Sequence, residues 1–205
     1  MDDDQVDQTD AARSAKGQRG AYAKGVQRRQ EILDRALQVF SERGYDRTSL
    51  RSIGEAIGVT HAALLHYFPS KEALLVAVLR ERDARSPSSG RMPFLEELVL
   101  GAEHNATVPG LIALYTSMAG TSADAGNEEA RAYFSDRFTR IRSRVAAEIR
   151  ADGRFGEADS IKLASLIIAA SDGLQMQWLL DPDVDIAGSL DLLQRILQID
   201  TPAPG

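Results

Sequence analysis

The stretch from Leu50 to Pro69, LRSIGEAIGVTHAALLHYFP, has the spacing of two short helices joined by a tight turn. The first helix needs a small residue where the second crosses it, and Gly54 supplies one. The turn needs a residue that tolerates a positive φ, and Gly58 supplies that. Apolar residues that such a pair would bury recur at the matching offsets, as Ile53, Ile57, Val59 and Leu64. The combination predicts a helix-turn-helix, with helices over about 49–57 and 60–66.

The second helix of a helix-turn-helix enters the major groove of DNA and presents its first residues to base edges. Here these residues are Thr60, His61 and Ala62, although Thr60 could equally do no more than cap the helix. His61 can donate to guanine or accept from an amine, according to its protonation, whereas Ala62 can contact only apolar groups such as the thymine methyl. One turn later, His66 and Tyr67 are candidates for contacts to the phosphate backbone.

Three flanking residues are further candidates for phosphate contacts. Thr48 can cap the first motif helix and leave its backbone amides facing a phosphate. Arg51 follows on the exposed face, where it could also be a plain solvated charge or a partner of Glu55. Lys71 stands in the first turn of the next helix, where a cation is unfavourable to the helix dipole. That misfit favours an external anion.

The net charge of −6 is unevenly distributed along the chain. Residues 1–10 carry five Asp and no base, residues 11–71 carry eleven Lys/Arg against five Asp/Glu, and residues 72–205 carry thirteen against twenty. A basic segment in an acidic chain is typical of a nucleic-acid contact confined to one region, although chance clustering would look the same. We expect residues 1–25 to form a flexible arm. It could lay Arg19 and Lys24 along the minor groove, or merely keep the chain in solution.

Apolar residues recur at helical spacing along nearly the whole chain, so we expect an all-α fold. Besides the motif, the pattern predicts helices over about 27–43, 70–84, 94–102, 108–118, 127–151, 159–180 and 187–198, with a linker over 86–90. The arginine-rich face of the helix over 127–151 is expected to be wet. The helix over 159–180 is apolar on more than one side. Such a helix must be covered on two faces, and the commonest second cover is another subunit.

Composition excludes several classes of protein. The chain has 205 residues, 43% of them hydrophobic and 26% charged, which is typical of a soluble globular protein. It has no cysteine, which excludes disulfides, cysteine zinc sites and thiol nucleophiles and fits the cytoplasm. The acidic start is unlike a signal peptide, and no run approaches the roughly 18 apolar residues of a membrane span. Because no metal pair, nucleophile elbow, phosphate loop or dinucleotide motif occurs, we expect no metal, no cofactor and no enzymatic activity.

The motif and its flanks resemble the tetracycline-repressor (TetR) family of bacterial transcriptional regulators. The resemblance covers about residues 26–80 and rests on VFSERGY at 39–45, TSL at 48–50, the helix-turn-helix, and HYFPSKEALL at 66–75. The block Tyr-Phe-Pro-Ser-Lys-Glu does not belong to helix-turn-helix proteins in general. Carried over by position, the base-facing residues would be Thr60, His61, Ala62 and Leu65, and the phosphate contacts Thr48, His66, Tyr67 and Lys71. Many family members have an aromatic residue where this chain has Leu65.

The resemblance also implies an organisation for the rest of the chain. It implies a DNA-binding domain over residues 26–71 and a helical ligand-binding and dimerisation domain over 72–205. In the family the last two long helices form the dimer interface, which would place Leu166, Ala170 and Leu193 between subunits.

A ligand pocket would lie among the middle helices, lined by aromatic residues and methionine with a few polar groups. The candidates are Tyr115, Met118, Phe134, Phe138, Asp172, Gln175 and Trp178, and each could instead be ordinary core. Asp172 and Gln175 are the better hints, because buried polar groups need partners. A hydrogen bond at a helix end or between subunits would satisfy them equally.

The sequence therefore predicts a cytoplasmic homodimer that binds a near-palindromic double-stranded DNA operator as a repressor and is released by a small-molecule effector. A transcriptional activator of the same fold and a helical interaction protein without DNA binding are the alternatives.

Overall fold

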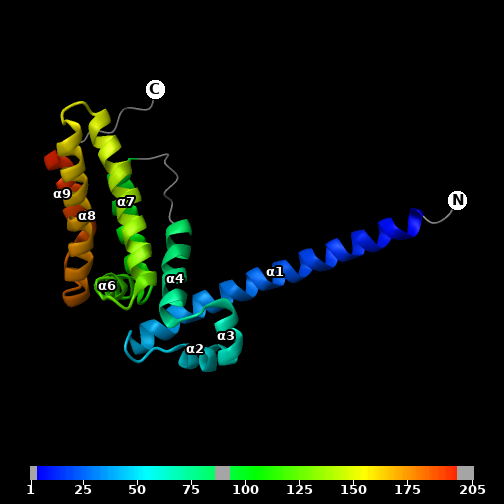
Figure 1. Cartoon of the computed structure of the whole chain (residues 1–205). Coiled ribbons are helices and arrows are strands. Elements are labelled where there is room, and N and C mark those ends of the chain that lie inside the picture. The colour runs from blue at the N-terminus through cyan, green and yellow to red at the C-terminus, as the bar shows by residue number, and fades with distance from the viewer. Residues whose placement is uncertain (1–3, 86–92, 198–205) are drawn as a thin grey trace.

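The computed structural model describes the backbone of residues 4–85 and 93–197, and within these ranges the side chains from residue 24 onward. Every regular element in the described part is an α-helix, which confirms the all-α prediction. The helices are α1 (Asp4–Arg43), α2 (Leu50–Ile57), α3 (His61–Tyr67), α4 (Lys71–Arg85), α5 (Phe94–Thr107), α6 (Leu111–Thr121), α7 (Glu128–Ala151), α8 (Glu157–Leu180) and α9 (Ile186–Leu197). In Figure 1, α2 and α3 lie below the end of α1, α4 rises from them, and α7 and α8 pack side by side.

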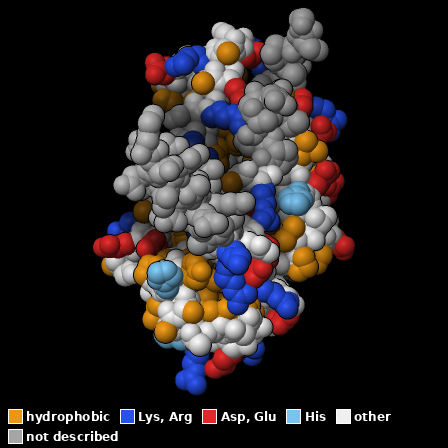
Figure 2. All heavy atoms as spheres, turned by 90° about the vertical axis from the view of Figure 1, so that its right-hand side faces the viewer, with side chains coloured by type: hydrophobic (Ala, Val, Ile, Leu, Met, Phe, Trp, Pro, Cys, Tyr) orange, Lys and Arg blue, Asp and Glu red, His pale blue; other side chains and the backbone are white. Residues whose placement is uncertain are grey.

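The helix-turn-helix forms as its sequence predicts. Ser49 caps α2 by accepting a hydrogen bond from the amide of Ser52, whose side chain in turn accepts from the amide of Ser49. Gly58 ends the helix at φ +68°, and at Gly54 a β-carbon would lie 2.6 Å from the carbonyl oxygen of Val59. The two glycines therefore have the turn and crossing roles expected of them. At the lower end of Figure 2, where α2 and α3 lie, basic and histidine side chains stand beside apolar ones.

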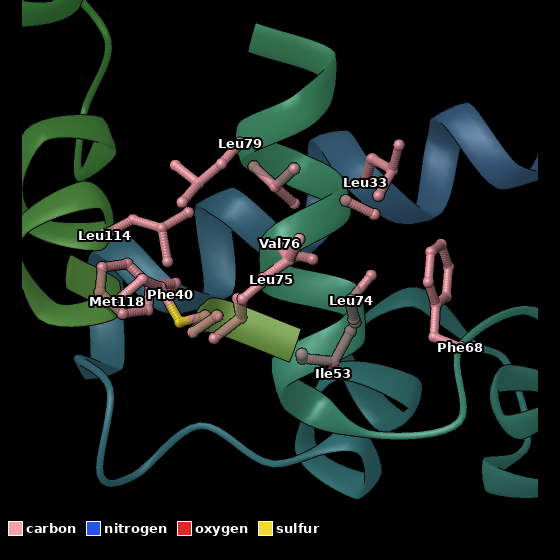
Figure 3. Close-up of a cluster of buried hydrophobic side chains, with 14 of the residues drawn as sticks. Leu33, Phe40, Ile53, Phe68, Leu74, Leu75, Val76, Leu79, Leu114 and Met118 are labelled. Atoms are coloured by element: carbon pink, nitrogen blue, oxygen red, sulfur yellow. The ribbon is translucent and has the colours of Figure 1, made fainter. Parts of the chain in front are cut away.

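One hydrophobic core joins the helix-turn-helix to the helices that follow it. Figure 3 shows the side chains that meet there, from α1 (Leu33, Phe40), α2 (Ile53), α4 (Leu74, Leu75, Leu79) and α6 (Leu114, Met118). The turn before α6 also packs directly against α1, because a β-carbon at Gly110 would clash with the β-carbon of Ser41. The boundary expected after residue 71 falls at the start of α4, and the core continues across it. Helix α4 therefore packs against both the DNA-binding helices and the helices that follow them.

Helix α8 has one buried face and one exposed apolar face. Its buried face contributes Ala164 and Ile167 to a second core, shared with α5 and α7. On the other face, Ile161, Leu166, Met176, Leu179 and Leu180 are exposed. By length and composition α8 could cross a membrane, as could the bent pair α3–α4 taken as one span, so our expectation that no segment approaches a span was wrong. The exposed face is the one that we expected a second subunit to cover.

Two helix boundaries differ from the predicted ones. α1 begins at Asp4 rather than near residue 27, so it extends through the segment expected to be a flexible arm. That segment is rich in Ala, Arg, Lys and Gln, whose helix propensity offsets the cost of about 1 kcal/mol per glycine. Val108 caps the end of α5 instead of starting α6, which begins after Gly110 at φ +77°. The expected linker over 86–90 lies outside the described residues.

Candidate DNA-binding surface and ligand cavity

Helix α3 presents one face to solvent and anchors the other in the core. Leu64 is completely buried, whereas His61, Ala62 and His66 are exposed and Leu65 is 43% exposed. The predicted base-facing residues therefore lie together on an uncovered surface. Thr60 is the N-cap, and its hydroxyl oxygen accepts from the amide of Ala63 at 3.2 Å. A hydroxyl that accepts one hydrogen bond can still donate another, so capping does not exclude a contact with DNA.

The structure corrects the role expected of Thr48. The residue that caps α2 is Ser49, one position later. Thr48 is only 2% exposed, and its hydroxyl donates to the carbonyl oxygen of Gly44 at 2.6 Å. It therefore fastens the turn between α1 and α2, and its side chain is not available to a phosphate.

Arg51 and Lys71 both have partners within the chain. Arg51 pairs with Glu55 at 3.0 Å, but it is 83% exposed, and an exposed pair of this spacing contributes only about 0.3–0.5 kcal/mol. It is therefore free to exchange Glu55 for a phosphate. Lys71 donates to the carbonyl oxygen of Tyr45 at 3.3 Å and lies 3.8 Å above the ring of that residue. An internal partner thus explains the cation at the start of α4, where we expected an external anion.

The remaining predicted DNA contacts are Tyr67, Lys24 and Arg19. Tyr67 is half-buried, and its ring meets that of His66 edge-on at 5.5 Å. Lys24 is exposed on α1, and the side chain of Arg19 lies outside the described residues. Sequence reasoning did not consider Arg29 of α1, whose guanidinium lies 5.1 Å from the ring of Phe68 at the end of α3.

A cavity of about 150 Å³ lies among α4, α5, α6, α7 and α8. Of the predicted pocket residues, Tyr115, Asp172 and Gln175 line it. The other four do not: Met118, Phe134 and Phe138 belong to the first core, and Trp178 packs against a third core formed by α5, α6 and α9. The expected aromatic lining is replaced by charged residues, among them Arg82, Asp83, Glu97, Arg137 and Arg144.

The arginines of α7 were missed because that face of the helix was expected to be wet. Arg137 and Arg144 are seven residues apart and flank Ile141, which belongs to the apolar stripe of α7. Residues spaced by three or four positions share a helix face, so this spacing was the available signal.

Asp83 ties α4 to α7 at one end of the cavity. Its carboxylate accepts from Arg82 at 2.7 Å and from the hydroxyl of Tyr133 at 2.8 Å, and it lies 3.6 Å from Nε of Arg137. Burial acts to raise the pKa of Asp83, but the neighbouring Arg82 and Arg137 together hold it below its ordinary value. The carboxylate is therefore ionised and already shared between two cations.

A second ion network lines the cavity between α5 and α7. Arg144 donates two hydrogen bonds to the buried carboxylate of Glu97, at 2.6 and 2.8 Å, and a third to Glu148 at 3.2 Å. Glu148 accepts from the amide of Phe94 at 2.8 Å, which satisfies the start of α5, where Pro93 provides no side-chain cap. Paired, hydrogen-bonded charges of this kind hold their helices in a defined register.

Three polar groups in the cavity are incompletely satisfied within the described residues. Asp172 accepts from the hydroxyl of Tyr115 at 3.1 Å and has no ion-pair partner there. Gln175 is 7% exposed; its amide donates to the carbonyl oxygen of Ser171, but its Oε1 has no hydrogen-bond partner. Nε of Arg137 is buried and also lacks one. Buried polar groups without partners are uncommon and point to a missing ligand or water.

We expect the substitution Asp172→Asn to stabilise the ligand-free protein near neutral pH. Burial raises the pKa of Asp172, and Arg137 and the hydroxyl of Tyr115 oppose this only in part. The unfolded chain therefore ionises this carboxyl first, so the native carboxyl costs stability once the pH exceeds the unfolded value. Asparagine removes that cost and can still accept a hydrogen bond from the hydroxyl of Tyr115.

Thermal unfolding should show a higher Tm for the Asp172→Asn variant at pH 7, and the difference from the unsubstituted protein should shrink as the pH falls towards about 3.9. Asp136→Asn, at an exposed position of α7, is the control; an equal gain there, or a constant difference at all pH values, would contradict the assignment.

Two of the three predicted interface residues are at least partly exposed on α8, and the third is packed within its own chain. Leu166 is 65% exposed and Ala170 is half-buried on α8. Leu193 instead packs against the second core of its own chain. On α9 the outward-facing apolar residues are Leu192 and Ile196. The choice of Leu193 as an interface residue was therefore wrong, because Leu193 lies on the face of α9 that packs against its own chain.

Comparison with known proteins identifies the amino-terminal half. Residues 32–78 match the family model described as bacterial regulatory proteins, tetR family. The chain is 43% identical over 58 residues to the HTH-type transcriptional repressor Rv1474c of Mycobacterium tuberculosis, and 50% identical over 54 residues to the HTH-type transcriptional regulator RutR of Escherichia coli K12. The helix-turn-helix and the helices on either side of it therefore match the TetR family.

Likeness to TetR-family proteins differs between the two halves. The two alignments cover 28% and 26% of this chain, and 31% and 26% of the respective relatives. The fold as a whole matches a transcriptional regulator of Saccharomonospora viridis solved in complex with choline, with a TM-score of 0.65 at 24% identity, over 84% of this chain and 96% of that one. Sequence likeness is thus concentrated in the helix-turn-helix, whereas the helices beyond it share only the fold with this solved structure.

Proposed function

We propose that the protein is a homodimeric repressor of bacterial transcription, which binds a near-palindromic operator and leaves it when a small molecule occupies the cavity. The observation that carries the proposal is the exposed face of α3 on a helix-turn-helix of TetR-family sequence. Nothing in the described residues covers His61, Ala62 or Leu65, so they are free to enter a major groove. Two such helices in a dimer would read two half-sites, and the protein would act where the chromosome is, in the cytoplasm.

The route from cavity to DNA runs through α4. Arg82 and Asp83, near the end of this helix, line the cavity, whereas Leu74 and Leu75, near its start, lie in the core shared with α1 and α2. A ligand that alters the contacts of Asp83 would tilt α4 and with it the helix-turn-helix. It can shift the equilibrium only by the difference in its affinity for the two conformations. The choline complex of the Saccharomonospora viridis protein supports a ligand site in this fold.

The experiment is selection of bound DNA from a pool of genomic fragments. The purified full-length protein is incubated with the pool, the retained DNA is sequenced, and the complex is sized. We expect enrichment of a palindrome bound by a dimer, and an affinity that falls steeply with salt because phosphate contacts release counterions. A folded dimer that retains no sequence above random DNA would reject the regulator and favour a helical interaction protein.

Two substitutions should separate base contacts from backbone contacts. We expect His61→Ala to relax the preference at one base pair by about 1–3 kcal/mol, because His61 lies at the exposed start of α3. Arg51→Ala should weaken binding to all sequences alike and reduce the salt dependence, because Arg51 is 83% exposed and free to exchange Glu55 for a phosphate. Titrations against operator and random DNA measure both. Equal losses on the two DNAs for both variants would reject this division of roles.

A further inference from the structure

The cavity holds one cationic group and one anionic group that the protein leaves incompletely matched. Three of the arginines that line it have a carboxylate each: Arg82 has Asp83, Arg140 has Asp136, and Arg144 has Glu97. Arg137 has to share the carboxylate of Asp83 with Arg82, and its Nε lies 3.6 Å from that carboxylate. This buried Nε makes no hydrogen bond in the described part of the chain. Among the described residues, Asp172 in turn accepts a hydrogen bond only from the hydroxyl of Tyr115.

These two groups converge on one side chain. The guanidinium of Arg137 lies 5.3 Å from the centre of the Tyr115 ring, and the hydroxyl of the same ring donates to Asp172 at 3.1 Å. Arg137 is also close enough to influence the ionisation of Asp172. The two do not pair directly, since no nitrogen–oxygen distance between them is within 4.0 Å. A small molecule between them could therefore contact both.

Gln175 adds a directional requirement. It lies on α8 almost one turn after Asp172, and its buried Oε1 has no hydrogen-bond donor among the described residues. A ligand group next to Asp172 would thus face a carboxylate and an amide oxygen, both acceptors. Such a pair selects a group that carries several N–H donors, and an ammonium satisfies both while it also neutralises the carboxylate.

Charge balance and cavity size further restrict the kind of ligand that the cavity can bind. A ligand with only a positive or only a negative charge would leave Arg137 or Asp172 desolvated and unmatched, which is costly in a buried site. The volume of about 150 Å³ is below the roughly 300–1,000 Å³ of pockets for drug-sized ligands. An uncharged, extended apolar molecule fits neither the lining nor the space.

We propose that the cavity binds a small zwitterion of the α-amino acid type, with its ammonium group at Asp172 and Oε1 of Gln175 and its carboxylate at Arg137. This inference rests on the proposed function and gives it an effector class. The carboxylate would compete with Asp83 for Arg137, which is how the ligand would disturb the contact between α7 and the end of α4.

The test is binding of the standard L-amino acids, one by one, to the full-length protein, measured by thermal unfolding and then by calorimetry. For the strongest ligand, the matched amine without the carboxylate and the matched acid without the amine are measured as well. We expect at least one amino acid to raise the Tm with increasing concentration, and each matched compound to bind at least about 10-fold more weakly. Failure of every amino acid, or equal binding of the amine or the acid, would overturn the proposal.

Variants locate the site. Asp172→Asn and Gln175→Met should each weaken the amino acid by at least about 10-fold, since each removes an acceptor from the ammonium site. Asp159→Asn, at an exposed position of α8 whose partner Lys162 also lies outside the cavity, should leave binding unchanged. Because Asp172→Asn is expected to stabilise the fold, its loss of binding would not be a loss of structure. Unchanged binding by both cavity variants would place the ligand elsewhere and overturn the assignment.

The DNA selection distinguishes failure of this inference from failure of the proposed function. If the protein enriches an operator but binds no amino acid, the effector class is wrong and the regulator stands. If it binds an amino acid through Asp172 but enriches no DNA with or without that ligand, the ligand site stands and the repressor is rejected.

Discussion

Replacing Gly54 by valine is expected to abolish operator binding while the helices beyond α4 stay folded. A β-carbon at this position would lie 2.6 Å from the carbonyl oxygen of Val59 and 3.2 Å from Cδ1 of Leu64. The nearer atom belongs to the backbone of the turn, so it cannot rotate away as a side chain could. Even one extra methylene in a packed site costs about 1–3 kcal/mol, and valine adds a branched group where α2 and α3 cross. Relief requires α3 to move, which displaces His61 and Ala62 from the groove.

The measurement is affinity for the selected operator, with helix content and dimer size recorded alongside. We expect a loss of at least about 100-fold in affinity, or about 2.8 kcal/mol, with little change in helix content. Gly120→Val is the matched control, because Gly120 is also helical, lies on α6 away from the helix-turn-helix, and a β-carbon there would meet nothing within 4 Å. Normal operator binding by Gly54→Val would mean that α2 and α3 do not cross as the structure places them.

The helix-turn-helix was predictable because its constraints are local. Gly54, Gly58 and the buried offsets of α2 and α3 follow from how two short helices must cross, which a stretch of twenty residues encodes completely. Most other helices were located for a related reason, since an apolar stripe of helical period marks the face that must be buried. The first part of α1 was not predicted as helix, because its glycines were given more weight than the helix-forming residues around them.

The cavity was not predictable to the same degree, because its lining depends on pairing between distant helices. Asp172 and Gln175 were recognisable as polar residues within an apolar helix. Nothing local in the sequence distinguishes the half-buried Arg137 from the exposed Arg140, three residues later on the same helix. What distinguishes them is Asp83 on α4, and that contact exists only once the chain has folded. Lys71 shows the same limit, since its partner Tyr45 is 26 residues away.

The exposed apolar surface of α8 and α9 is the expected dimer interface. We expect the double substitution Leu166→Glu with Ile196→Glu to convert the dimer to a monomer. Both side chains are about two-thirds exposed, at 65% and 68%, so glutamate at these positions removes little packing from the chain itself. In a dimer, however, the added carboxylates would be buried against the partner's apolar surface without counter-charges.

Loss of the dimer should cost far more affinity than loss of any single base contact. Once one α3 is bound, the other reaches its half-site as an intramolecular event, and such linkage contributes about 10²–10⁴ in affinity without any new contact. The double variant should therefore sediment as a folded monomer and bind the operator weaker by about that factor, with a smaller loss on a single half-site. Leu100→Glu, on α5, is the control, because Leu100 is an exposed leucine outside this surface. A double variant that stays dimeric would show that the subunits meet elsewhere, and a monomer that keeps full operator affinity would show that one α3 is sufficient.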